Sequence, residues 1–177
     1  MPAYNLSQLL TDTASQYPDR IAIVFGESRI TYAELDAASN QVANLLVSRS
    51  IQPGDKVALS CPNLPYFTIV YYGILKAGAT VVPLNVLLKG REVAYHLADS
   101  EATAYFAFEG TADLPIGEQA WGGFQESDGC TEFFLIESGA DDWAGADQPQ
   151  RYASVIAEQA PTFEVVARDE DDTAVIL

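Results

Sequence analysis

Apolar residues recur along the first 108 positions of the chain in two alternating patterns. Stretches with apolar residues three and four positions apart predict amphipathic helices, and short β-branched runs between turn residues predict strands. The predicted helices cover 5–17, 32–50, 66–77 and 89–99, and the predicted strands cover 21–25, 29–31, 56–61, 80–83 and 104–108.

The order of these elements predicts the fold. Helices that separate successive strands can serve as the crossover connections that parallel strands require. We therefore expect an α/β fold with an open, mostly parallel sheet and right-handed crossover helices, preceded by an N-terminal helix and a β-hairpin. The hairpin is expected to turn through a three-residue loop over 26–28.

Two helix starts carry recognisable signals. Thr31 and Glu34 have the spacing of a capping box, in which each residue accepts a hydrogen bond from the backbone of the other. Asn63 is the expected N-cap of the 66–77 helix, with Pro65 in its first turn. This helix is apolar nearly all round, which favours burial on several sides as part of the core.

The pattern is less regular after residue 108. Residues 109–130 contain five glycines and predict a long irregular loop, a feature that is either functional or mobile. Beyond it we expect a strand over 131–136, an acidic loop over 137–148, a short helix over 151–159, an extended segment over 161–168, a charged turn over 169–172 and a strand over 173–177.

Composition narrows the class of protein. The chain is 49% hydrophobic, yet it has no run of about 18 apolar residues, so we expect no transmembrane segment. The first ten residues lack the charged and apolar regions of a signal peptide. Cys61 and Cys130 have no metal-binding or redox spacing, and Cys61 is interpreted as a buried, reduced thiol. These features predict a cytoplasmic protein.

The net charge of −16 is spread unevenly. Residues 1–100 carry 7 Lys/Arg and 8 Asp/Glu, whereas residues 101–177 carry 2 and 17. Because no basic region is present to attract phosphates, the sequence argues against nucleic acids and anionic membranes as partners. The acidic half is interpreted as a solvated surface, since apolar segments alternate with its charges.

Few residues in the sequence suggest catalysis, nucleotide binding or metal binding by themselves. His96 is the only histidine, and a single histidine on a helix is typical of a surface or packing residue. No GxGxxG or Walker string is present. Asp141–Asp142 and the 169–172 turn could bind a hard cation, but neither matches a calcium loop, so solvated turns are favoured and no metal site is predicted.

The segment that follows the 80–83 strand is the one place where the fold itself suggests a site. Ligands of open α/β sheets bind outside the carboxyl ends of the strands, so Asn85 and the three residues after it could line a site. The alternative is that Asn85 caps the next helix or the loop that leads to it. Both interpretations stay open at this point.

Several strings of this sequence are motif-like, in order and at fitting spacing. They are Ile30–Leu35 (ITYAEL), Gly54–Leu59 (GDKVAL), Leu75–Asn85 (LKAGATVVPLN) and Asp171–Leu177 (DDTAVIL). Together they resemble the N-terminal part of the AMP-forming adenylate ligases, and in particular the long-chain fatty acid–CoA ligases. In Leu75–Asn85, Gly78 suits a helix-to-strand turn with positive φ, and Pro83 suits a strand end.

The resemblance implies an enzyme that uses ATP and Mg²⁺ to activate a fatty acid as an acyl-adenylate, then transfers the acyl group to coenzyme A. It implies that 1–177 is an N-terminal subdomain fragment, with a well-matched α/β part over 1–108, a loop-rich part over 109–150 and a lead-in to the family's phosphate-binding loop over 151–177. The catalytic residues would then lie beyond Leu177, and the isolated fragment would be inactive.

The resemblance also places Asn85 and Val86 near the path of coenzyme A, as cofactor-binding residues. The sequence departs from some relatives in one respect, because Phe106–Asp113 contains no arginine that could bind the nucleotide phosphates. Two other functions are alternatives: a non-catalytic α/β binding or interaction module, and the adenylation module of a peptide synthetase. The apolar stretch 173–177 predicts self-association, for example as a homodimer.

Overall fold

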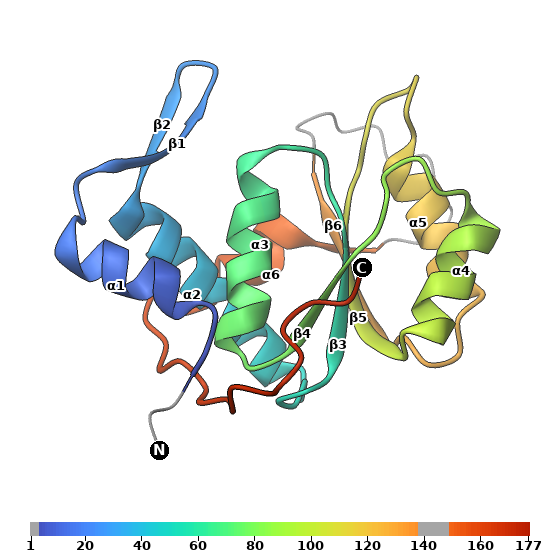
Figure 1. Ribbon diagram of the computed structural model, residues 1–177. Coiled ribbons are helices and arrows are strands. Elements are labelled where there is room, and N and C mark those ends of the chain that lie inside the picture. The colour runs from blue at the N-terminus through green and yellow to red at the C-terminus, as the bar shows by residue number, and fades with distance from the viewer. Residues whose placement is uncertain (1–3, 138–148) are drawn as a thin grey trace.

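A computed structural model describes residues 4–137 and 149–177. A five-stranded sheet lies between two layers of helices, and a two-stranded hairpin stands apart from it (Figure 1). Every neighbouring pair in the five-stranded sheet is parallel, which confirms the predicted α/β fold. In spatial order the strands are β4 (Thr80–Pro83), β3 (Lys56–Ser60), β5 (Ala102–Phe108), β6 (Glu132–Ile136) and β7 (Gln150–Arg151).

The helices divide between the two faces of this sheet (Figure 1). Side chains alternate along each strand, so neighbours such as Phe133 and Phe134 belong to different cores. One face is covered by α2 (Tyr32–Ser48), α3 (Pro65–Lys76) and α6 (Tyr152–Ile156), and the other by α4 (Gly90–Asp99) and α5 (Ile116–Gln125).

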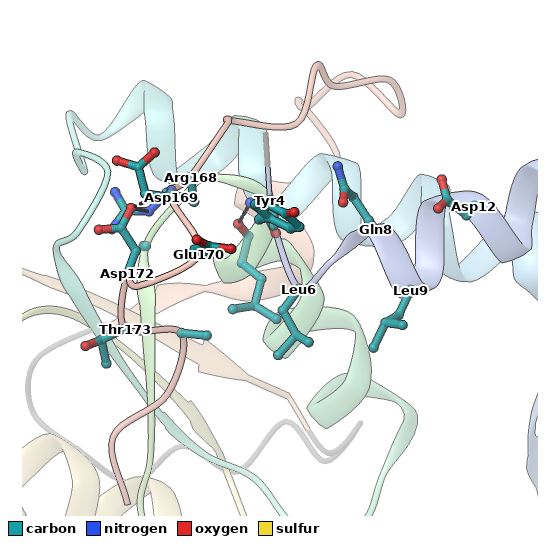
Figure 2. A pocket seen from close by; sticks show the side chains of 15 residues that line it. Tyr4, Leu6, Gln8, Leu9, Asp12, Arg168, Asp169, Glu170, Asp172 and Thr173 are labelled. Atoms are coloured by element: carbon teal, nitrogen blue, oxygen red, sulfur yellow. Dashed lines mark hydrogen bonds and ion pairs between the residues drawn. The ribbon is translucent and has the colours of Figure 1, made fainter. Parts of the chain in front are cut away.

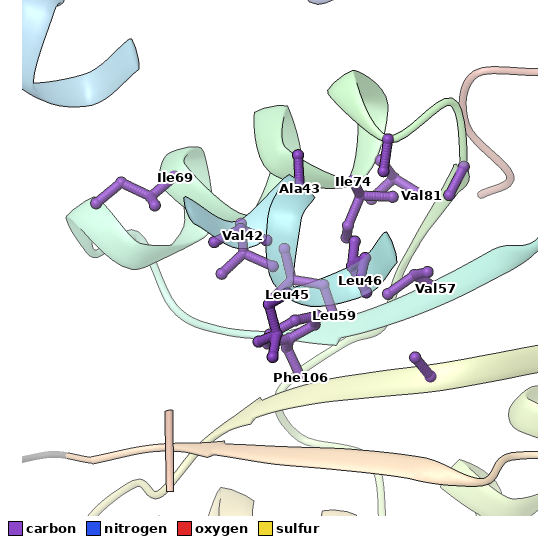
Figure 3. Packing of buried hydrophobic residues seen from close by; sticks show 14 of the residues in the cluster. Val42, Ala43, Leu45, Leu46, Val57, Leu59, Ile69, Ile74, Val81 and Phe106 are labelled. Atoms are coloured by element: carbon purple, nitrogen blue, oxygen red, sulfur yellow. The ribbon is translucent and has the colours of Figure 1, made fainter. Parts of the chain in front are cut away.

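The first core is mostly aliphatic and tightly packed, and it includes Phe106 stacked on Phe134. Val42 and Leu46 of α2 and Ile74 of α3 are fully buried and lie over Leu59 of β3 (Figure 3). Helices α2 and α3 approach closely because α3 has a glycine at position 73, where a Cβ atom would overlap Val42. This contact fixes how the two helices sit on the sheet.

The second core contains a helix that the sequence did not reveal. Residues 109–130 were expected to be irregular, but α5 forms there and packs against α4. Two of its glycines serve packing rather than turns. A Cβ atom on Gly117 would lie 2.9 Å from Leu135 Cδ1, and one on Gly123 would lie 2.5 Å from Val93 Cβ. Small side chains therefore let α5 approach both the sheet and α4.

The N-terminal elements are α1 (Gln8–Gln16) and the antiparallel hairpin of β1 (Ile21–Phe25) and β2 (Ser28–Thr31). The hairpin projects from the rest of the molecule (Figure 1). Its loop has two residues rather than the expected three, because Ser28 already pairs with Phe25 and Gly26 has a φ of 57°. Such a positive φ is typical of tight two-residue hairpin turns.

The predicted capping box of α2 is confirmed. Thr31 Oγ1 accepts from the Glu34 amide at 3.2 Å, and Glu34 Oε2 accepts from the Thr31 amide at 2.8 Å. The prediction for α3 is wrong in one detail, since Leu64 rather than Asn63 is its N-cap residue, without a side-chain hydrogen bond. Pro65 holds the residue before it in an extended conformation, so the helix begins one position later than a cap at Asn63 would place it.

The final segment runs beside β4 and extends the sheet. Residues 173–177 were expected to form a strand, and they form one parallel bridge, between Val175 and Val81. The Val81 amide donates to the Ala174 carbonyl at 2.9 Å, and the Ile176 amide donates to the Val81 carbonyl at 3.0 Å. The direction of the segment is therefore the same as that of β4.

Candidate ligand-binding edge of the sheet

The strand order creates a natural site for a ligand. Numbered from β3 along the chain, the sheet has the order 2-1-3-4-5, so β4 and β5 lie on opposite sides of β3. In doubly wound sheets such a reversal leaves a crevice outside the carboxyl ends of the strands, where ligands bind. Here the segments that follow β3, β4, β5 and β6 begin with Cys61, Leu84, Glu109 and Glu137, respectively.

The sheet register aligns these segments. Leu59 pairs with Pro83 and Ser60 pairs with Ala107, so the row that contains Cys61 also contains Asn85 and Phe108. Phe108 in turn pairs with Ile136, the last residue of β6. Asn85 therefore lies at the same edge as the carboxyl ends of β3, β5 and β6, as expected for a residue that lines a site there.

The side-chain oxygen of Asn85 has a local structural role. Asn85 Oδ1 accepts from the Leu87 amide at 2.9 Å, which closes a turn in the loop before α4. This contact is the loop cap that was one of the two interpretations. The Asn85 side chain is nonetheless exposed, Val86 is half-buried, and Leu87 beside them is 64% exposed. A role of Asn85 and Val86 in binding stays a prediction.

Two glutamates at this edge are held by the backbone around them. The Glu109 amide donates to Ile136 O at 2.8 Å and the Glu109 carbonyl accepts from the Gly117 amide at 2.9 Å, so the end of β5 is tied to β6 and to the start of α5. Glu137 Oε2 accepts from the Ala153 amide at 3.1 Å, in the first turn of α6. A carboxylate directly after an apolar strand was the signal in the sequence that could have pointed to both residues.

Cys61 is at this edge, but its surroundings do not favour the thiolate form that a nucleophile requires. Its side chain is buried, and burial raises the pKa of the thiol to about 12. Cys130 on the other face is also buried, with a pKa raised to about 12 by the same cause. Because the thiolate is the reactive form, both cysteines are protonated and inert near neutral pH. The prediction of a buried structural thiol at position 61 is confirmed.

The remaining candidates have local, structural contacts. His96 is half-buried on α4 with its ring 5.5 Å from that of Tyr95. In the 169–172 turn, Asp172 Oδ2 accepts from the Asp169 amide at 2.9 Å and forms an ion pair with Arg168 at 3.1 Å. Asp141–Asp142 lies outside the described residues. Within 4–137 and 149–177 no three His, Cys, Asp or Glu side chains come together as a metal site, and no helix is long and apolar enough to cross a membrane.

The Leu75–Asn85 motif carries a buried charge that sequence reasoning missed. Lys76 is fully buried, and its ammonium donates to Asp36 Oδ1 at 2.7 Å, Asp36 O at 3.0 Å and Asn40 Oδ1 at 2.6 Å. Burial lowers the pKa of Lys76, and the hydrogen bond and charge of Asp36 oppose that effect. The available signal was a lysine within an otherwise apolar stretch.

This buried cluster is connected to the end of the chain. With its oxygen bound to Lys76, the Asn40 amide directs its nitrogen to the Pro161 carbonyl at 3.0 Å. Gln41 Nε2 donates to the carbonyls of residues 156 and 159, and Asn44 Nδ2 donates to those of residues 160 and 162. Three neighbouring side-chain amides of α2 therefore hold the backbone between residues 156 and 162.

The motif itself holds the next part of that segment. The Val166 amide donates to the Lys76 carbonyl at 2.9 Å, and Thr80 Oγ1 donates to the Thr173 carbonyl at 2.8 Å. Gly78, with a φ of 76°, confirms the predicted turn, and a Cβ atom there would lie 2.8 Å from Val166 Cγ1. The motif thus fixes the path of residues 160–176 across α2, α3 and β4.

Comparison with known proteins assigns the family. Residues 10–177 match the family described as AMP-binding enzyme. The chain belongs to the AMP-binding enzyme family. The fold of this AMP-binding chain is also found in solved structures of an anthranilate CoA ligase in complex with anthranoyl-AMP (TM-score 0.83, 23% identity) and a benzoate CoA ligase from Burkholderia xenovorans (TM-score 0.79, 22% identity). The similarity extends over 99% and 97% of this chain, respectively, and over 32% of each of the two solved chains.

Curated relatives of this AMP-binding chain include two kinds of enzyme. The long-chain-fatty-acid–CoA ligase of Bacillus subtilis is 34% identical over 109 residues, 62% of this chain and 20% of that protein. The crotonobetaine/carnitine–CoA ligase of Salmonella paratyphi B is 38% identical over 104 residues, 56% of this chain and 20% of that protein. A linear gramicidin synthase of Brevibacillus parabrevis is 37% identical over 115 residues, 64% of this chain and 2% of that protein. The matched part is thus at most a fifth of each of these relatives.

Proposed function

We infer that this AMP-binding chain is the N-terminal part of a cytoplasmic acid–thiol ligase that acts on fatty acids. The carboxylate would attack the α-phosphate of ATP to give an acyl-adenylate and pyrophosphate, and the thiol of coenzyme A would then displace AMP to give the thioester. The observation that carries the proposal is the family match over residues 10–177, together with the likeness to the Bacillus subtilis fatty-acid ligase.

The role of this chain in such an enzyme would be to position other parts. Residues 160–176 are held by α2 amides, by Lys76 and by β4, and they enter the sheet edge in the direction of β4. In the family that the sequence resembles, the strand that corresponds to the end of this segment leads into the phosphate-binding loop. The subdomain over 1–177 would therefore fix where that loop starts.

Asn85 and Val86 are proposed to contact coenzyme A. Both follow β4 at the edge of the sheet where ligands of this architecture bind, and Asn85 is exposed there. The backbone of their loop is set by the bond from the Leu87 amide to Asn85 Oδ1. The loop would thus be shaped before coenzyme A arrives, which lowers the ordering cost of binding.

The residues around this edge do not form a complete phosphate or metal site. Within the described segments that follow the strands, 61–64, 84–89 and 109–115 and Glu137, the one Lys or Arg is Lys89, at the N-cap of α4. The described residues also bring together no ligand set for Mg²⁺. Mg²⁺ commonly takes one or two carboxylates together with substrate phosphates, so the remaining groups would come from elsewhere in the parent enzyme. We accordingly propose that the chain by itself has no adenylating activity.

The test uses the gene that encodes this chain. Its reading frame is sequenced past the codon for Leu177, and the complete product is assayed with ATP, Mg²⁺ and coenzyme A against fatty acids, crotonobetaine, benzoate and amino acids. The expected result is pyrophosphate release with fatty acids and formation of their CoA thioesters. A folded full-length product that converts none of the fatty acids would overturn the proposal. The 177-residue chain, assayed in parallel, should release no pyrophosphate above background.

A second candidate is the adenylation module of a peptide synthetase. The 37% identity to the linear gramicidin synthase favours it. The same assay separates the two functions, because an adenylation module would release pyrophosphate with amino acids and form no CoA thioester. If the complete product adenylates no acid at all, the third interpretation, a non-catalytic binding module, becomes the best account.

A further inference from the structure

The connection from α6 to the segment beside β4 is held mainly by side chains. Residues 157–172 form no helix or strand, and within the described residues no backbone hydrogen bond reaches residues 160–165. The donors come instead from α2. Gln41 Nε2 and Asn44 Nδ2 each donate to two carbonyls between residues 156 and 162, at distances of 2.9 to 3.2 Å. Both N–H groups of each amide are therefore used on this backbone.

The next part of the connection is held by the residues before α1. Asn5 is buried, and its Nδ2 donates to the Val166 carbonyl at 2.9 Å and to a carbonyl at the end of α3 at 2.7 Å. The backbones of Tyr4 and Arg168 exchange two hydrogen bonds of 2.9 Å. Figure 2 shows Tyr4 beside residues 168–173, at a pocket that α1 also lines. The connection is thus anchored at both ends before it reaches β4.

The pairing with β4 is short, so its register needs support from elsewhere. Val175 and Val81 form the one parallel bridge of the segment, and two backbone hydrogen bonds flank it. The turn of a hairpin fixes the register of its strands, but these two strands are far apart in the sequence and share no turn. The observed register brings Leu177 level with Pro83, the last residue of β4, at the candidate ligand-binding edge. A slip of one residue would move that point by about 3.3 Å.

Apolar contacts alone would not select this register. Phe163, Ala174 and Val175 pack against the first core. Such packing is non-directional, whereas a hydrogen bond requires its donor and acceptor to be aligned. The four hydrogen bonds from Gln41 and Asn44 therefore restrict the path of the connection more closely than its apolar contacts do.

We propose that Gln41 and Asn44 are positioning residues for the adenylation step, an inference that rests on the proposed function. Their amides hold the connection, and the connection sets the register of residues 173–177 on β4. That register in turn sets where the phosphate-binding loop of the parent enzyme begins. An error of about 1 Å in the placement of reacting groups can lower a rate about 100-fold, so residues distant from the reaction can control it. Asn40 is set apart because its oxygen also binds Lys76.

The first test measures hydrogen exchange by mass spectrometry in the complete product of the gene. Gln41→Glu and Asn44→Asp keep the size of the side chain but replace the donating NH₂ by an oxygen. The matched control is Gln16→Glu, which makes the same chemical change at an exposed position of α1. The amides of Val81 and Ile176 are bonded in the pairing, and they should exchange about tenfold faster in the first two variants and at the parent rate in the control. Unchanged exchange of both amides would overturn the proposal.

The second test measures the kinetics of the same variants with a fatty acid that the parent product converts. Gln41→Glu and Asn44→Asp should raise the KM for ATP about tenfold, and Gln16→Glu should leave it unchanged. The KM for coenzyme A should stay within about twofold, because Asn85 and Val86 directly follow β4. If the role were only structural, loss of folded enzyme would lower kcat and leave both KM values unchanged, and this result would overturn the proposal.

Failure of the proposed function would give a different result. A folded parent product that converts no fatty acid would overturn that function before any variant is compared. The adenylation role of Gln41 and Asn44 would be overturned with it. Hydrogen exchange at Val81 and Ile176 would still decide whether the two amides set the register of the final segment, because that measurement requires no activity.

Discussion

The two faces of the sheet are built on different principles. The α2/α3 face combines a mostly aliphatic core with a buried ionic cluster, in which Lys76 binds Asp36 and Asn40. The α4/α5 face has no such cluster among the described residues; its centre is Phe133, with Trp121 at 5.1 Å and Phe124 at 5.2 Å. Hydrophobic packing is non-directional, whereas hydrogen bonds to a buried charge fix positions. The α2/α3 face is therefore the one that can orient residues 160–176, which run along it toward β4.

The largest expected effect comes from the buried charge on the first face. Lys76→Met would remove the ammonium and leave Asn40 Oδ1 buried without its donor. Removing one partner of a buried ion pair typically lowers the free energy of unfolding by about 3–5 kcal/mol. Because the Asp36 side chain is 25% exposed, we expect a loss of about 3 kcal/mol here. Urea unfolding followed by circular dichroism measures this loss.

Lys56→Met is the matched control. Lys56 also forms one ion pair, with Glu101 at 3.2 Å, but both side chains are partly or largely exposed. Exposed pairs contribute about 0–1 kcal/mol, so this variant should unfold close to the parent chain. The Lys76 variant should also be cleaved faster by trypsin after Arg168, because Asn40 would no longer be oriented toward Pro161. Equal stability of the two variants would contradict an orienting role for the cluster.

The second prediction concerns the packing of the α4/α5 face. Gly123→Ala places a methyl group 2.5 Å from Val93 Cβ and 2.6 Å from the Gly90 carbonyl oxygen, so α5 must move away from α4. Overpacking of this kind costs about 1–3 kcal/mol. Thermal unfolding by calorimetry should show the lower stability.

The adjacent glycine provides the control for this prediction. A Cβ atom on Gly122 would have nothing within 4 Å, and both glycines lie inside α5. Gly122→Ala should therefore leave stability unchanged or raise it by up to about 1 kcal/mol, through the better helix propensity of alanine. If both variants lose stability equally, the close approach of α4 and α5 is not what position 123 provides.

The two faces also differ in how well the sequence predicted them. Helix α2 was predicted because its apolar residues recur at helical spacing behind a capping box, and α3 was predicted because a continuous apolar stretch follows Pro65. Helix α5 was missed because Gly117 and Gly123, which normally indicate turns, are required there by the close approach of Leu135 and Val93. Such a requirement is set by tertiary contacts and leaves no periodic signal in the sequence.

The candidate site was predicted in part for a similar reason. The position of Asn85 after a buried strand followed from the alternation of strands and helices, and the structure places it at the expected edge. The Lys76 cluster was missed because its partners are 36 and 40 positions away in the sequence, on another helix. No single-sequence pattern reports such a contact, although a lysine among apolar neighbours indicates that a partner is needed.

The smallest effect is a pH dependence that the two faces should share. Cys61 belongs to the first core and Cys130 to the second, and burial raises the pKa of each thiol from 9.0 to about 12. Above pH 9 the unfolded chain loses these protons while the folded chain keeps them, so each thiol lowers the free energy of unfolding by about 1.4 kcal/mol per pH unit up to about pH 12. This contribution is fully present below pH 9. Lys76 changes the free energy of unfolding in the opposite direction, because its pKa is lowered.

Urea unfolding between pH 8 and 10 tests the contribution of the two thiols. The free energy of unfolding should decline less steeply with pH for Cys61→Ala and for Cys130→Ala than for the parent chain, by equal amounts. A decline that only one substitution reduces would mean that water reaches one of the two cores, and would break the symmetry that the burial of both thiols implies.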